Sequence, residues 1–244
     1  MNLQKSTLLL LLVATCALAS GCGSSGGSSA SDGSPLADTS ITKAQAVAYA
    51  RAVNLDAGDI PGSSIIEAEG EGEAPTVAGV EFERCAGGVN PERRVVDIHS
   101  PSFRVPSTSK GGRVRSAVEV MPTAALTARD NAAARSARGR ACLTRALPEQ
   151  NAGPLRYGPV SVSSLPNLLP GADGSFGLRL TTTVIGRNLQ DGETRTPVYI
   201  DVFSFVSGPA EVSLTTFGVS RPVSSATEQR LLPLLFSRAR EHKL

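Results

Sequence analysis

The first 39 residues of this 244-residue chain determine which part of it can fold. Residues 1–21 contain one positive charge, Lys5, followed by an apolar run from Leu8 to Ala19. A run of about 12 apolar residues is too short for a hydrocarbon core that needs roughly 20, but it is typical of a secretory signal. The pattern predicts a signal peptide over residues 1–21 that directs the chain out of the cytoplasm.

The residues before Cys22 decide where that signal is cut. Leu18-Ala19-Ser20-Gly21-Cys22 resembles a bacterial lipobox, in which the cysteine sulfur receives a diacylglyceryl group and the cysteine becomes the first mature residue. Cleavage after Ala17-Leu18-Ala19 is the alternative, and it would release a soluble protein beginning at Ser20. We expect Cys22 to be lipidated, so that two acyl chains hold the protein at the extracytoplasmic face of the cell membrane.

Residues 22–39 combine this cysteine with a Gly/Ser-rich tether that can bury no core. As a coil, residues 23–38 would span about 20 to 24 Å. Residues 40–244 are then left to form a single domain of ordinary size. The whole chain has 24 Lys+Arg against 22 Asp+Glu, which excludes a strongly basic nucleic-acid binder.

Hydrophobic periodicity divides the folded part into helical and extended segments. Thr42 and Gln45 have the spacing of a capping box and open a first helix, and Ser225 with Glu228 opens a last one. An Ala- and Arg-rich helix is expected over residues 123–147, with Gly139 as its weak point. Alternation predicts strands over residues 80–85, 95–98, 103–105, 113–121, 155–165, 176–185, 197–207 and 210–219.

This order predicts an α+β fold in which an antiparallel sheet is flanked by helices. Both faces of the strand over residues 197–207 are apolar, so we expect it to be central and covered on both sides. Turns are expected at residues 190–192 and 208–209. In the middle helix, Leu126, Ala133, Ala137 and Ala141 should face inward and Arg135, Arg138 and Arg145 outward.

Two cysteines, Cys85 and Cys142, remain in the folded part once the signal and the lipidated residue are set aside. Outside the cytoplasm such a pair persists as a disulfide, and this one would close a loop of about 57 residues. Zinc is the competing interpretation, but it needs about four ligands. The glutamates of residues 67–73 lack the spacing of a calcium loop and indicate an acidic surface loop. We therefore expect no metal and no cofactor.

Asp97-Ile98-His99-Ser100 brings an acid, an imidazole and a hydroxyl together in the sequence. On an extended segment Asp97 and His99 share one face while Ser100 points away, and no Gly-x-Ser-x-Gly elbow exposes a nucleophile. A structural histidine is therefore favoured over a catalytic one. The Gly-rich residues 171–177 precede a strand rather than a helix, which favours a plain turn over a phosphate site.

Three residues are candidates for binding a ligand. Asp201 lies in the most apolar strand, where a buried carboxylate requires a partner such as an arginine. A structural ion pair is the simpler explanation, and a ligand contact is the alternative. Arg135 and Arg138 of the middle helix could attract lipid headgroups or an acidic glycan, although a solvated helix face has the same composition.

The chain resembles actinobacterial envelope lipoproteins of the PsbP-like and LpqN-like type and the extracellular sensor domains of mycobacterial receptor kinases. The resemblance is carried by Asp59-Ile60-Pro61-Gly62 after the opening helix, Ser100-Pro101-Ser102-Phe103, and the two cysteines. It implies an α/β sandwich that binds an envelope ligand or protein partner without catalysis. The alternatives are an envelope hydrolase that uses His99 and a purely structural lipoprotein.

Overall fold

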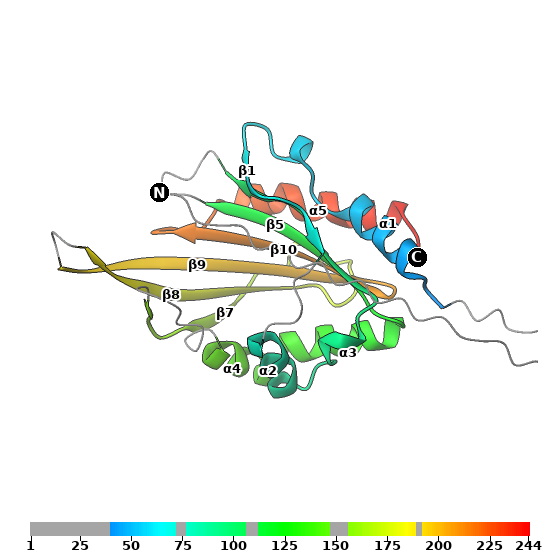
Figure 1. Ribbon diagram of the computed structural model, residues 1–244, viewed down its shortest axis with the longest axis horizontal. Coiled ribbons are helices and arrows are strands. Elements are labelled where there is room, and N and C mark those ends of the chain that lie inside the picture. The colour runs from blue at the N-terminus through cyan, green and yellow to red at the C-terminus, as the bar shows by residue number, and fades with distance from the viewer. Residues whose placement is uncertain (1–39, 72–76, 106–111, 147–155, 189–191) are drawn as a thin grey trace, which may run out of the picture. The chain divides into compact units, whose positions relative to one another are not determined.

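A ten-stranded antiparallel sheet with helices on both faces makes up the centre of the fold (Figure 1). The computed structural model describes residues 40–71, 77–105, 112–146, 156–188 and 192–244. These belong to one unit that runs from Thr39 to Leu244. The predicted signal peptide, lipidated Cys22 and tether lie outside the described residues. The α+β class and the antiparallel sheet flanked by helices are confirmed.

The strands follow the order β1-β4-β5-β10-β9-β8-β6, with β3 also paired to β5, β2 to β3, and β7 to β8. The strand bounds are β1 Ser64–Glu67, β2 Gly70–Glu71, β3 Val96–His99, β4 Ser102–Arg104, β5 Arg113–Val120, β6 Arg156–Tyr157, β7 Ser161–Leu165, β8 Phe176–Asn188, β9 Gly192–Ser207 and β10 Ala210–Val219. The helix bounds are α1 Lys43–Val53, α2 Val77–Ala86, α3 Ala124–Arg135, α4 Ala137–Ala146 and α5 Ser225–Glu241, with 3-10 turns η1 Ala57–Asp59 and η2 Pro91–Arg93.

The helices α1 and α5 cover one face of the sheet and enclose the main apolar core (Figure 1). Phe205 of β9 and Leu214 of β10 are fully buried beneath Leu231 and Leu235 of α5. The capping box predicted for Thr42 is present, whereas the cap of α5 is Ser224, one residue before the predicted start. This face is an ordinary hydrophobic interface, and each fully buried leucine stabilises it by about 2 kcal/mol.

The helices α2, α3 and α4 form a second layer, here called the helix layer, on the opposite face (Figure 1). Its apolar contact is small: Leu143 of α4 packs against Val160, Leu178 and Leu180 near β7 and β8. Strand β9 lies between β8 and β10 with apolar residues on both faces, so the predicted central strand is confirmed. The turn at Gly208 is confirmed by its positive φ of 58°, while residues 189–191 of the other turn lie outside the described residues.

The strand predicted over residues 80–85 is wrong, because these residues lie in α2. Six alternating residues are too few to distinguish the two-residue period of a strand from the 3.6-residue period of a helix. Phe82, Cys85 and Ala86 also stand at i, i+3 and i+4, which is helical spacing, and all three are at least partly buried. The error concerns only the type of this element, because the segment that follows it still joins the sheet as β3.

The single helix predicted over residues 123–147 is also wrong, because Ser136 divides it into α3 and α4. The Ser136 backbone is extended, with a ψ of 162°, and its hydroxyl donates to the carbonyl of Ala133 and accepts from the Gly139 amide. One serine therefore ends one helix and begins the next. A Cβ on Gly139 would overlap the Ala133 carbonyl, so this glycine permits the sharp join.

Three smaller predictions also need correction. Ala137 and Ala141 are exposed, and the inward face of α3 is made instead by Thr127, Asp130 and Asn131. The strand predicted over residues 155–165 is two strands, β6 and β7, separated at Gly158-Pro159, where proline has no amide for a ladder. The predicted acidic loop contributes its first residues to β1 and β2.

The predicted disulfide joins Cys85 of α2 to Cys142 of α4, with their Cα atoms 5.9 Å apart. The guanidinium of Arg145 lies against both sulfurs, at 3.1 Å from Cys85 and 3.7 Å from Cys142. Because the bridge links two helices of one layer, it fixes α2 to α4 where apolar contact is limited.

We predict that replacing both cysteines, as Cys85→Ser with Cys142→Ser, lowers the free energy of unfolding by about 2 to 4 kcal/mol, because the unfolded chain regains the freedom of a long closed loop. Urea unfolding with and without a reducing agent measures this. The reduced wild type should unfold close to the double variant. An unchanged midpoint in both samples would contradict the prediction.

Candidate functional site

A group of five acidic side chains lies between the sheet and the helix layer. Strand register places three of them in one row, because Asp97 of β3 pairs with Glu119 of β5, which pairs with Glu211 of β10. Glu83 of α2 and Asp130 of α3 approach this row from the helix layer. We call these five residues the carboxylate cluster. Like charges directly opposite on a sheet repel one another, so the cluster needs a counter-charge or protons.

Arg94, directly after η2, supplies that counter-charge. Its side chain is 17% exposed and its nitrogens lie 2.9 Å from Glu119 Oε2, 3.4 Å from Asp97 Oδ2 and 3.8 Å from Glu83 Oε1. One guanidinium therefore contacts carboxylates from two strands and one helix. Such a group joins the helix layer to the sheet through charge rather than through apolar packing.

The helix side of the cluster depends on close approach of the chain. The Val89 amide donates to Asp130 Oδ1 at 2.7 Å, which holds the turn after α2 against α3. A Cβ on Gly88 would overlap the carboxylate oxygens of Glu83 and Asp130. Glycine at position 88 thus makes room for two acidic groups in direct contact with each other.

Burial changes the protonation of the cluster. It raises the pKa of Glu83 to about 8, with a further rise from Asp130, and raises the pKa of Glu211 to about 7. Burial also raises the pKa of Glu119, opposed by Arg94. The hydroxyl of Ser204 donates to Glu211 and favours its charged form. The cluster can therefore hold protons at neutral pH and release them as the pH rises.

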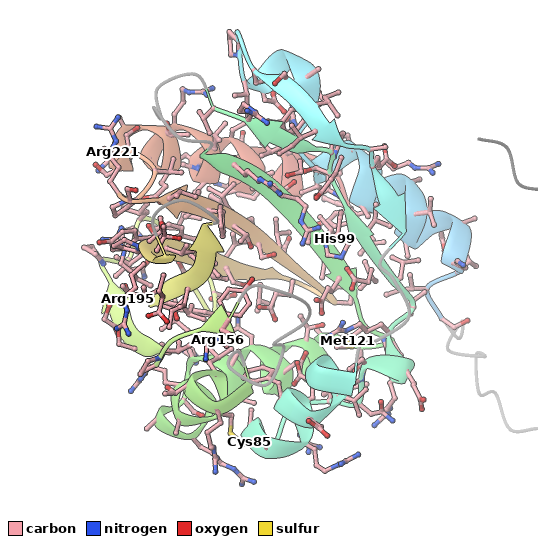
Figure 2. The ribbon with its side chains drawn as sticks, turned by 60° about the vertical axis from the view of Figure 1, so that its left-hand side comes forward. Cys85, His99, Met121, Arg156, Arg195 and Arg221 are labelled. Atoms are coloured by element: carbon pink, nitrogen blue, oxygen red, sulfur yellow. A yellow bond between two sulfur atoms is a disulfide. The ribbon has the colours of Figure 1, made fainter. Side chains whose placement is uncertain are left out.

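His99 lies at the rim of the cluster, on the sheet face that looks toward the helix layer (Figure 2). Its Nε2 is 3.4 Å from Asp97 Oδ1, so these two residues share a face as predicted. Ser100 is 2% exposed; its hydroxyl donates to the Pro101 carbonyl and accepts from the Ser116 amide. The carboxylate of Asp97 thus lies beside the His99 imidazole, whereas the Ser100 hydroxyl lies on the opposite side of the segment.

Asp201 is 1% exposed on β9, and both of its oxygens accept hydrogen bonds from Arg179 of β8, at 2.7 and 2.6 Å. Its cross-strand neighbour Thr216 donates to Glu228 of α5. Burial, followed by the nearby Asp201, raises the pKa of Glu228 to about 7. The geometry is the ion pair expected for a buried carboxylate, and a ligand contact by Asp201 stays a prediction.

The two candidate arginines lie on the helix layer and are exposed, as predicted. The Arg138 side chain donates to the Cys85 carbonyl, so it is oriented by the end of α2 next to the disulfide. Arg135 ends α3, and its carbonyl accepts from Arg140. A role in binding stays a prediction for both residues.

Sequence reasoning missed the carboxylate cluster. Alternation correctly places Asp97 and Glu119 opposite the apolar core, but it does not say whether that face meets solvent or a second layer. Asp130, in the Ala- and Arg-rich segment whose arginines fit a solvated helix face, is buried. In the described ranges no cluster of His, Cys, Asp and Glu has an arrangement suited to a metal ion, and none of the helices there is both long and apolar enough to cross a bilayer.

No protein-family model matches this chain, and no curated protein matches it significantly. Among solved structures, it is similar to the extracellular domain of PknH from Mycobacterium tuberculosis, with a TM-score of 0.42 and 8% sequence identity. The likeness covers 83% of this chain and 99% of that chain.

We predict that the protein becomes less stable as the pH rises from about 5 to about 8. The folded state holds a proton on Glu83 up to about pH 8, whereas the unfolded chain releases it near 4.5. Unfolding therefore releases protons in this window, and each one lowers stability by up to about 1.4 kcal/mol per pH unit. Glu83→Gln should flatten the dependence and raise the stability at pH 8.

Thermal unfolding at several pH values measures this slope. The matched control is Glu81→Gln, two residues away on the exposed side of α2. It should retain the slope of the wild type. A slope that is unchanged in Glu83→Gln would show that this carboxyl does not carry the bound proton.

A second prediction concerns Arg179. Arg179→Met leaves Asp201 charged and buried without its partner, so it should lower stability by about 3 to 5 kcal/mol. In the double variant Arg179→Met with Asp201→Asn the loss should be smaller, because the carboxylate that lost its partner is removed as well. A double-mutant cycle by urea unfolding measures the coupling, and purely additive losses would argue against the buried pair.

Proposed function

We propose that this chain is a membrane-anchored extracytoplasmic lipoprotein that binds a ligand or a protein partner without catalysing a reaction. The observation that carries the proposal is the Cys85–Cys142 disulfide. Stable disulfides belong to oxidising compartments, which agrees with the export signal over residues 1–21. The lipidation of Cys22 rests on the lipobox resemblance.

The non-enzymatic part of the proposal is supported by the arrangement around His99. A hydrolase would need a hydroxyl positioned against the imidazole, which in turn needs its acid. Asp97 lies beside His99, but Ser100 directs its hydroxyl to backbone groups on the other side of β3. We therefore favour a binding or sensor domain over the hydrolase alternative.

The helix layer is the surface that we propose for the partner. It presents exposed Arg135, Arg138 and Arg145 around the disulfide, and an anionic ligand would find donors there at fixed positions. Beneath this layer lies the carboxylate cluster, whose charge depends on pH. A partner bound outside would thus meet a layer whose attachment to the sheet responds to proton concentration.

The test begins with the full chain expressed in a bacterium that processes lipoproteins. We expect wild type to sediment with membranes and to yield an N-terminal peptide that starts at Cys22 and has the added mass of a diacylglyceryl group. Cys22→Ala should lack that modification, whereas Cys16→Ala, inside the signal peptide, should retain it. An unmodified peptide starting at Ser20 would contradict the anchor.

The same preparation tests the binding role. Native mass spectrometry of wild type should show a bound molecule or protein that is reduced in Arg135→Gln with Arg138→Gln and retained in Arg129→Gln, an exposed site on the same layer. Equal occupancy in all three proteins would argue against the helix layer as the binding surface.

A further inference from the structure

A hollow of about 310 Å³ lies where three distant parts of the chain meet. Its lining combines Tyr49 of α1, the β9–β10 turn from Ser207 to Pro209, Ala239 and Arg240 at the end of α5, and the residues after that helix from His242 to Leu244. Figure 1 shows the start of α1, the β9–β10 turn and the C-terminal residues at the same end of the molecule. Tyr49, Ala239 and Arg240 of this lining belong to α1 and α5, which cover the face of the sheet opposite to the carboxylate cluster.

Tyr49 gives this hollow a polar group without a partner. The residue is 5% exposed, and within the described residues its hydroxyl has no hydrogen-bond partner. Burial raises the pKa of Tyr49, so the phenol stays protonated, and the nearby Ser207 side chain opposes that rise. The Ser207 hydroxyl itself donates to the Ala239 carbonyl at 3.4 Å. A buried hydroxyl without a partner costs free energy, which points to a ligand that accepts from it.

The end of α5 and the residues after it contribute basic side chains to the hollow. Arg240, His242 and Lys243 are exposed at the hollow, and the guanidinium of Arg240 is held 5.8 Å above the Phe236 ring. Glu241 does not line the hollow and accepts from the Ser237 hydroxyl at 2.8 Å. A hydroxyl donor beside the charges of Arg240 and Lys243 favours a phosphate group, which accepts several hydrogen bonds at once.

The position along the chain identifies the source of that phosphate. The predicted tether joins the domain at Ser40, and α1 begins at Lys43, which is about 9 Å along the helix axis from Tyr49. A lipid attached to Cys22 would hold this end of the domain near headgroups, within the tether's reach of about 20 to 24 Å. Exposed Leu244 adds an apolar side chain at the same place.

We propose that the hollow binds the phosphate of an anionic phospholipid headgroup, with the Tyr49 hydroxyl as a donor and Arg240 and Lys243 as counter-charges. The choice of a lipid source rests on the anchor proposed above. Lysine and arginine side chains close to an anionic membrane are attracted by its negative surface potential. The contact would set the orientation of the tethered domain on the membrane, so that the helix layer remains available to a partner.

The first experiment uses the full chain, purified in a non-ionic detergent, and a soluble headgroup. Glycerophosphoglycerol is titrated by calorimetry beside inorganic phosphate. We expect the phosphodiester to bind and to bind more tightly than inorganic phosphate. This titration does not depend on lipidation, so absence of binding would contradict the headgroup site alone. The mass of the N-terminal peptide tests the anchor separately.

The decisive variant is Tyr49→Phe. Since the hydroxyl has no hydrogen-bond partner among the described residues, its removal should leave the melting temperature unchanged or raise it. Headgroup binding should weaken about tenfold through one lost hydrogen bond to a charged group. The matched control is Tyr199→Phe on β9, which should bind as wild type does. Wild-type affinity in Tyr49→Phe would overturn the proposal.

Charge is tested by Arg240→Gln against Arg221→Gln, which lies just before α5 at the opposite end of that helix (Figure 2). Only Arg240→Gln should weaken binding and reduce its salt dependence. In vesicles containing the lipidated chain, phosphatidylglycerol but not phosphatidylcholine should slow hydrogen exchange of amides 239–244. Equal exchange in both vesicles, or tighter binding of inorganic phosphate, would overturn the assignment to a lipid.

Discussion

The rest of the structure depends on the two apolar faces of β9. Phe203 and Phe205 point into the core beneath α1 and α5, while Ile200 and Val202 point toward the helix layer. A strand with this composition is stable only when both faces are removed from water, so the chain must supply helices on both sides of the sheet. The chain meets this requirement with α1 and α5, from the two ends of the domain, on one face and with α2 to α4, from its middle, on the other.

Different interactions hold the helices against the two faces of the sheet. On the α1 and α5 side, close-packed leucine, valine and phenylalanine exclude water across most of the face. On the other side, apolar contact is concentrated over β7 to β9, and the strands β3, β5 and β10 meet the helix layer through Arg94 and five carboxyl groups. Hydrophobic stabilisation does not depend on pH, whereas a charged interface does. The helix layer is therefore the part of the fold whose attachment can be adjusted.

The fold was largely predictable because its strongest signals are local. Alternation over ten or more residues identified β8, β9 and β10, and capping residues located α1 and, to within one residue, α5. The pairing of Asp201 with an arginine followed from the cost of burying a charge. The predictions for short segments were wrong. The sequence of α2 fits both the strand period of two residues and the helix period of 3.6 residues. The join at Ser136 depends on a single side chain, which donates to the Ala133 carbonyl and accepts from the Gly139 amide. The carboxylate cluster was not predicted for another reason. Glu119 and Glu211 are 92 residues apart in the sequence and become neighbours only when β5 and β10 pair.

The disulfide and the cluster act on the same layer in complementary ways. The bridge ties α2 to α4, and the bond from the Val89 amide to Asp130 ties the end of α2 to α3, so the three helices are linked among themselves. When the carboxyl groups ionise, repulsion between the row on the sheet and the acids on the helices acts across the interface. Because the disulfide joins α2 covalently to α4, α2 cannot move away from the sheet by itself to reduce this repulsion. It acts instead on the contact between the whole layer and the sheet, where few apolar side chains oppose it.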